Sequence, residues 1–168
     1  MPNINSQLDL SFERVVPVEP SAIWRCWTKP EHLLHWFTPA PWKTIDCVID
    51  LRPGGIFSTT MLSPEGKEFP NRGCYLEIVP NRLLVWTNAL EPDFRPSAMM
   101  SETPCDGFAF TASIALLPVD AGTKYTATVM HASEHGKQQH EAMGFEKGWG
   151  LALDQMVAFI QSTEIQKP

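Results

Sequence analysis

Apolar and polar residues alternate in the first part of the chain and again through its middle, which is the pattern of half-buried β-strands. The stretch "LDLSFERVV" (residues 8–16) is the first predicted strand. Two short helices are predicted next, at about 20–27 and 30–37, because Pro20 and Pro30 each stand where proline can begin a helix. The sequence "TPAP" then breaks the helical pattern and returns the chain to extended structure.

The middle of the chain predicts a meander of antiparallel strands joined by tight turns. One such turn is "RPGG" (residues 52–55), where proline presets φ and glycine permits positive φ. Residues 91–107 are predicted to be a long loop rich in proline, serine and acidic residues, and loops of this length are often functional. The predicted strands of this part are residues 42–51, 56–62, 71–80, 82–90, 108–118 and 123–131.

The C-terminal stretch "HEAMGFEKGWGLALDQMVAFI" (residues 140–160) has helical periodicity, with a bend expected near Met143 and Gly144. Gly144 and Gly148 flank the apolar face of this helix. They either let the backbone approach a strand closely, leave room for a ligand, or belong to a subunit interface. Gly150 falls on the polar side and is explained only by a local bend. The predicted core-facing residues are Phe145, Trp149, Ala152, Leu153, Met156, Phe159 and Ile160.

Composition indicates one globular domain of 168 residues, with 43% hydrophobic and 19% charged residues. We expect a flexible tail at residues 1–7 and a single domain over 8–164. The 13 Lys and Arg against 19 Asp and Glu give a net charge of −6, which argues against nucleic acid and anionic membranes as partners. The N-terminus lacks the pattern of a secretory signal, so a cytoplasmic protein is expected.

Cysteine and histidine spacing gives no sign of a metal site. Cys26, Cys47, Cys74 and Cys105 are scattered singly, so we expect reduced thiols rather than a disulfide framework or a zinc cluster. The stretch "HGKQQHE" (residues 135–141) is not the HExxH pattern of a metalloprotease. No metal and no cofactor are therefore predicted.

The element order is one strand, two short helices, an antiparallel meander and a long helix, which implies an α+β protein with a sheet of about seven strands. The chain resembles the helix-grip (START/Bet v 1-like) fold of the START-like, or SRPBCC, superfamily. Within it, the chain is most similar to the branch named after the activator of the Hsp90 ATPase. The resemblance is carried by "FERVVPVEPSAIWRCWTKPEHLLHWF", "DLRPGGIFSTTMLSPEGKEF", "GCYLEIVPNRLLVWT" and "HEAMGFEKGWGLALDQMVAFI".

The resemblance implies a curved sheet wrapped around the C-terminal helix, with a deep, mostly apolar cavity between them for a hydrophobic small molecule. The six Trp, nine Phe and seven Met suit such a lining, and they also suit an ordinary core. Hsp90 is not expected as a partner, because the eukaryotic members with a chaperone role carry an additional N-terminal domain. The residues predicted to bind the ligand are Trp36, Trp42, Phe57, Met61, Trp86, Phe110, His131, Phe145, Trp149 and Met156.

Two functions are compatible with these residues, and we favour the first, small-molecule binding, over catalysis. The first is non-enzymatic binding of a hydrophobic or amphipathic small molecule, held by burial of apolar area. The second is an enzyme of the polyketide cyclase, aromatase or hydrolase type that uses the same cavity. In that case His131, at the end of the last strand, is the candidate acid/base group. Exposed sheet edges are in addition compatible with a homodimer.

Overall fold

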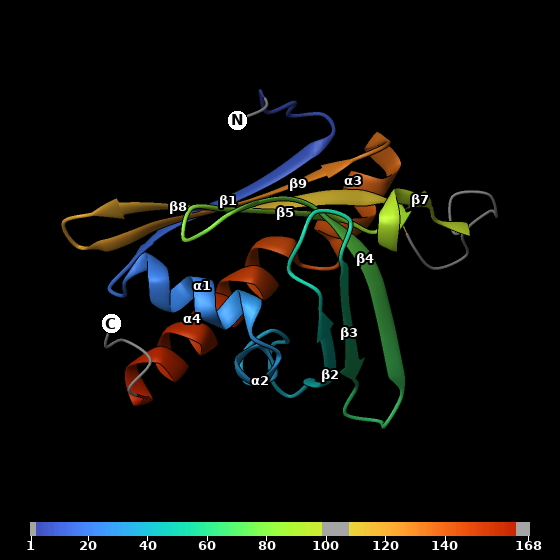
Figure 1. Ribbon diagram of the computed structural model, residues 1–168. Coiled ribbons are helices and arrows are strands. Elements are labelled where there is room, and N and C mark those ends of the chain that lie inside the picture. Colours follow the sequence, from blue (N-terminus) through green and yellow to red (C-terminus); the bar gives the residue numbers. More distant parts are fainter. Residues whose placement is uncertain (1–2, 99–107, 164–168) are drawn as a thin grey trace.

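The computed structural model describes residues 3–98 and 108–163, and it consists of a curved antiparallel sheet with the helices packed against it (Figure 1). The strands of the main sheet are β1 (Asp9–Val16), β2 (Lys43–Ile49), β3 (Ile56–Leu62), β4 (Glu68–Val79), β5 (Leu83–Thr87), β8 (Phe110–Val119) and β9 (Gly122–His131). The helices are α1 (Pro20–Thr28), α2 (Pro30–Leu33), α3 (Glu134–Ala142) and α4 (Phe145–Ser162).

The main sheet has seven strands in the order β1-β9-β8-β5-β4-β3-β2, and every neighbouring pair is antiparallel. The sheet turns sharply along β4, so that β2 and β3 run down beside the helices while β1, β8 and β9 cover them from above (Figure 1). The predicted helix-grip fold, an α+β fold with about seven strands around a long C-terminal helix, is confirmed.

The two short helices follow the first strand as predicted, and each begins at its proline. The second is shorter than the predicted 30–37, since α2 ends at Leu33 and isolated turns continue to Phe37. After Leu33 the His35 and Trp36 N–H groups donate to the His32 and Leu33 carbonyls, an i→i−3 pattern that replaces the α-helical ladder. Leu33 and Trp36 are both buried, and the Trp36 Nε1 donates a hydrogen bond of 3.1 Å to the Cys26 carbonyl.

The bend predicted near Met143 and Gly144 separates α3 from α4. Gly144 has a φ of 85°, which ends one helix and opens the next, and few other residues tolerate that backbone conformation. The apolar face predicted for α4 is confirmed. Phe145, Ala152, Leu153, Met156 and Ile160 are buried, and the remaining two aromatics of that face are partly buried against them.

The glycines of α4 differ from the sequence-based expectation. Gly148 has no atom within 4 Å of the position that a Cβ would take, so no close approach occurs there. The close approach occurs at Gly150, which is buried under β1. A Cβ at Gly150 would lie 3.0 Å from the Arg14 guanidinium and 3.8 Å from the Phe12 ring. Arg14 also forms an ion pair of 2.5 Å with Asp154, so small size at Gly150 lets β1 cross α4.

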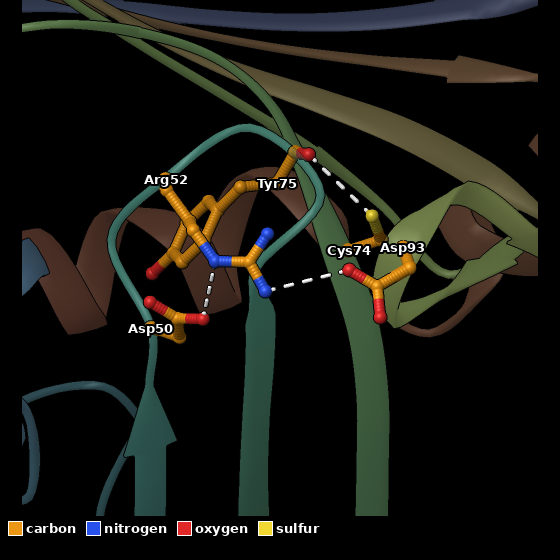
Figure 2. Close-up of polar contacts among 5 residues, drawn as sticks. All are labelled: Asp50, Arg52, Cys74, Tyr75 and Asp93. Carbon is orange, nitrogen blue, oxygen red and sulfur yellow. Dashed lines mark hydrogen bonds and ion pairs between the residues drawn. The ribbon is translucent and has the colours of Figure 1, made fainter.

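The turn that follows β2 is fixed to β4 by backbone hydrogen bonds, and its Arg52 side chain pairs with Asp50 and Asp93 (Figure 2). Arg52 contacts Asp50 at 2.7 Å and Asp93 at 3.4 Å. The Gly54 N–H donates to the Tyr75 carbonyl at 2.8 Å, and the Tyr75 N–H donates to the Gly55 carbonyl at 2.9 Å. The predicted "RPGG" turn therefore continues the sheet rather than projecting from it.

The segment predicted as a loop at 91–107 is partly regular. A small hairpin of β6 (Leu90–Glu91) and β7 (Arg95–Pro96) encloses the 3₁₀ turn η1 (Pro92–Phe94). The hairpin is anchored because the Asp93 N–H donates to the Gly54 carbonyl. Residues 99–107, including Cys105, lie outside the described residues. Of the described cysteines, Cys26 and Cys74 are buried free thiols and Cys47 is a half-buried one.

Candidate functional site

A groove with a volume of about 600 Å³ lies where the C-terminal half of α4 meets the segment that joins α2 to β2. Leu34 and Ile45 remain 38% and 42% exposed at this groove, so large apolar side chains meet solvent there. Its apolar lining consists of Leu34, Ala40, Trp42, Ile45, Ala158 and Phe159. Its polar lining consists of His35, Thr38, Lys43, Thr44, Gln155 and Ser162.

Gln155 holds the wall of the groove in place. Its Nε2 donates to the Trp36 carbonyl at 3.0 Å and to the Thr38 carbonyl at 2.9 Å. Its Oε1 accepts a hydrogen bond of 2.8 Å from the Ala40 N–H. The Thr38 and Thr44 hydroxyls lie 2.5 Å apart, which ties the same segment to β2. One side chain of α4 therefore fixes a stretch of chain that has no regular structure of its own.

Flat rings form part of the groove. The His35 imidazole stacks on Phe159, with ring centroids 4.6 Å apart and an angle of 11° between the planes. Trp42 packs against Phe69 of β4 with centroids 5.2 Å apart. Rings held in this way present rigid apolar surface, which suits the binding of an apolar molecule.

A second cluster lies at the other end of α4, around a pair of histidines. The His131 Nε2 and the His140 Nδ1 are 3.0 Å apart. Phe108, Phe110 and Phe145 surround the His140 ring, with centroids 4.8, 6.1 and 5.2 Å away. The pair joins the end of β9 to α3 inside an aromatic cage.

The protons of this pair can be assigned from their partners. The His131 Nδ1 lies 2.9 Å from the Leu8 carbonyl, which can only accept, so Nδ1 carries the proton. In the neutral ring the His131 Nε2 is then the acceptor, and the His140 Nδ1–H is the donor. Both nitrogens of His131 are thus occupied. The His140 Nε2 is the nitrogen of the pair without a hydrogen bond in the described part of the chain.

Comparison with known proteins shows the family to which this chain belongs. A family model described as Activator of Hsp90 ATPase homolog 1-like protein matches residues 17–161. The chain belongs to this family. The predicted resemblance to the branch named after the Hsp90 ATPase activator is therefore confirmed. Among curated proteins, no match is found.

Several solved structures share the fold of this chain. Protein NE0264 from Nitrosomonas europaea is 42% identical, with 95% of this chain and 97% of that chain covered and a TM-score of 0.87. A protein from Rhodobacter sphaeroides is 20% identical, with 96% and 97% covered and a TM-score of 0.80. Protein Ms6760 from Mycobacterium smegmatis is 23% identical, with 94% and 93% covered and a TM-score of 0.71. The last two show the fold alone.

In this family member the predicted ligand-binding residues fall into separate groups. Trp42 lines the groove, and Met61 pairs with the groove residue Thr44 across β2 and β3. Phe110 and Phe145 contact His140, the partner of His131, and Trp149 packs on Phe145 with ring centroids 5.3 Å apart. The remaining predicted residues, Trp36, Phe57, Trp86 and Met156, are buried in the core.

The core group is held together by ring contacts. Phe57 meets Trp86 at 5.4 Å between centroids, and Trp27 meets Trp86 at 5.1 Å and Trp36 at 4.8 Å. Beside them, the buried Tyr75 hydroxyl has no hydrogen-bond partner among residues 3–98 and 108–163. Burial raises the pKa of Tyr75 above its ordinary value, and the nearby Cys47 thiol raises it further, so the phenol is a neutral donor.

Several residues of these sites have no recognisable signal in the sequence. His35, Lys43 and Gln155 of the groove stand in segments without a recognisable motif. His140 lies in the stretch HGKQQHE, which has no recognised motif, and the ends of β9 and α3 bring it to His131. No helix in the described ranges is long and apolar enough to cross a membrane. Within the same ranges, no three His, Cys, Asp or Glu side chains are grouped to hold a metal ion.

The buried histidine is expected to make stability depend on pH. Burial, and to a lesser extent electrostatic interaction with the neighbouring His131, lowers the pKa of His140 from 6.5 to about 4. Between these values the unfolded chain binds the proton and the folded chain does not, so stability falls as pH drops below 6.5. We expect a loss of about 1–2 kcal/mol between pH 7 and pH 5, measured by urea unfolding.

The matched variants are His140→Gln and His135→Gln, since His135 is exposed on the same helix. His140→Gln should flatten the pH dependence, while His135→Gln should leave it as in the original chain. If both variants lose the same stability between pH 7 and pH 5, the pH dependence does not come from His140.

Proposed function

We propose that this protein binds a hydrophobic or amphipathic small molecule between its sheet and α4, with the groove as the site. The observation that carries the proposal is the groove itself, with its volume of about 600 Å³. Sites for small molecules are typically about 300–1,000 Å³, mostly apolar, with a few placed polar groups. The fold of the family supports the same placement, because the sheet encloses one face of α4.

Burial of apolar area is the expected source of affinity. A ligand that removes about 200 Å² of apolar surface from water gains about 5 kcal/mol before the entropic cost of association. Leu34 and Ile45 already meet water in the free protein, so covering them is favourable without any rearrangement of the core. The rings of Trp42 and Phe159 would contact the flat or extended body of the ligand.

Titration with the neutral probe 1-naphthylmethanol, followed by calorimetry, tests this proposal. We expect saturable binding that Phe159→Ala weakens about tenfold, since that change removes a wall of the groove. Leu151→Ala is the matched control, because Leu151 is an exposed apolar residue of the same helix outside the groove. Absence of saturable binding, or equal effects of the two changes, would count against the proposal.

A second candidate is an enzyme of the cyclase, aromatase or hydrolase type. The observation that favours it is the hydrogen bond between His131 and His140 inside the aromatic cage. Both ring nitrogens of His131 are already bonded, so a substrate would meet the His140 Nε2, with His131 as its positioning partner. His131 itself stays the predicted acid/base residue of the pair only if its bond to Leu8 opens.

The thiols bear on where the protein is located. The half-buried and buried free thiols of Cys26, Cys47 and Cys74 suit a reducing compartment, which supports a cytoplasmic location. A single domain over 8–164, a homodimer formed through sheet edges, and the absence of a role with Hsp90 stay predictions.

A further inference from the structure

The polar side chains of the groove fall into two groups when their hydrogen bonds are counted. Gln155 uses its amide on three backbone groups, and the Thr38 and Thr44 hydroxyls bond to each other. The Ser162 hydroxyl donates to the Phe159 carbonyl at 3.0 Å. These four side chains hold the walls together, and they are therefore not the groups that select a ligand.

Two polar side chains of the lining remain, and both are basic. Lys43, at the start of β2, is exposed and has no ion pair with any residue in 3–98 or 108–163. The His35 ring is held by its stacking on Phe159, and its nitrogens make no hydrogen bond within those ranges. Stacking fixes the ring plane and leaves the ring edge available as a donor.

The charge of the lining is opposite to that of the whole chain. The protein has a formal net charge of −6, yet the groove lining contains a lysine and a histidine and no carboxylate. Lys43 is exposed, so solvent and salt weaken its attraction for an anion, and the neighbouring apolar side chains add the burial of the ligand's body. A neutral apolar ligand would make no use of this arrangement.

We propose that the groove selects amphipathic anions, in which a carboxylate is bound by Lys43 and His35 and the apolar body lies against Leu34, Trp42 and Phe159. This inference rests on the proposed function, since it names the ligand class of the same site. Trp42 and Lys43 are neighbours in sequence, so the apolar and the charged contacts are offered side by side.

Two matched pairs of probes test the carboxylate preference by calorimetry. They are 1-naphthoate against 1-naphthylmethanol, and decanoate against decanol, so that a flat body is compared with a flexible one. We expect the carboxylate of at least one pair to bind at least tenfold more tightly than its alcohol, because a charge-assisted hydrogen bond replaces a neutral one. The preference should shrink as salt is raised from 50 to 500 mM, because salt screens the attraction between exposed charges.

Variants assign the preference to its residues. Lys43→Gln should weaken carboxylate binding about tenfold or more and leave alcohol binding unchanged. Lys147→Gln is the control, since it removes an equal charge from the N-terminal end of α4, away from the groove. His35→Phe keeps a ring to stack on Phe159 and should weaken carboxylate binding by a smaller factor of about two to five. Thermal unfolding confirms that each variant is folded.

The outcomes separate this inference from the function on which it rests. If alcohols and carboxylates bind equally, or if Lys43→Gln leaves carboxylate binding intact, the anion preference is wrong and apolar binding stands. If no probe of either pair binds, the proposed function fails and the preference fails with it. If Lys147→Gln weakens carboxylate binding as much as Lys43→Gln, general attraction by surface charge replaces a specific site.

Discussion

Replacing Gln155 by alanine is expected to lower the free energy of unfolding by about 2–3 kcal/mol, from three hydrogen bonds at about 0.5–1.5 kcal/mol each. The bonds join α4 to the Trp36 carbonyl, the Thr38 carbonyl and the Ala40 N–H. The segment from 36 to 40 has no helix or strand to hold it, so no other backbone ladder replaces the lost contacts. We therefore expect the groove to lose its shape along with the stability.

Urea unfolding and titration with 1-naphthylmethanol measure the two consequences of Gln155→Ala. Gln161→Ala is the matched control, because Gln161 is an exposed amide of the same helix outside the groove. Gln155→Glu adds a sharper comparison. A carboxylate can still accept from the Ala40 N–H, but it cannot donate to the two carbonyls, so it should destabilise at least as much as alanine. Unchanged stability in both Gln155 variants would show that solvent replaces these bonds without cost.

Gly55→Ala is expected to destabilise the fold by about 3 kcal/mol or more. A Cβ at residue 55 would lie 1.9 Å from the Asp50 carbonyl oxygen and 2.9 Å from the Arg52 carbonyl oxygen. Both atoms are backbone, so no side chain can turn aside. Relief requires the turn to move, which would break the 2.9 Å bond from the Tyr75 N–H and separate Arg52 from Asp50 and Asp93 (Figure 2).

Gly148→Ala is the control for this prediction, since a Cβ there meets no atom within 4 Å. Alanine has the higher helix propensity, so this change should stabilise the protein by about 0.5–1 kcal/mol. Chemical denaturation of both variants at neutral pH provides the comparison. A Gly55→Ala protein as stable as the original would mean that the turn adapts without loss, contrary to its contacts with β4 and η1.

Local sequence patterns predicted the elements that carry the fold. The alternation of residues 8–16 became β1, and the apolar face of residues 145–160 became the buried face of α4. Pro20 and Pro30 each begin a helix. These features depend on neighbours within a few residues, because backbone periodicity decides which side chains share a face. The end of α2 comes earlier than predicted, because i→i−3 turn bonds replace the helical ladder after Leu33.

The candidate site depended on contacts that sequence spacing does not encode. Phe57, Trp86 and Met156, which were predicted to line a cavity, are buried in the core, and their role in binding stays a prediction. The groove instead takes Gln155 from one end of the chain and the Trp36–Thr38 segment from the other. The partner of His131 likewise proved to be His140, across the junction between β9 and α3.

The sequence by itself determined the element order and the apolar face of the long helix, since both follow from local periodicity and turn chemistry, and its resemblance to a known family implied the fold family. Only the tertiary structure decided which polar groups are consumed by the walls of the groove and which remain for a ligand. That division leaves Lys43 and His35 available and occupies Gln155, Thr38 and Thr44. The physical reason is that a hydrogen bond is satisfied in space, by whatever group the fold brings within reach, and not by a neighbour in the chain.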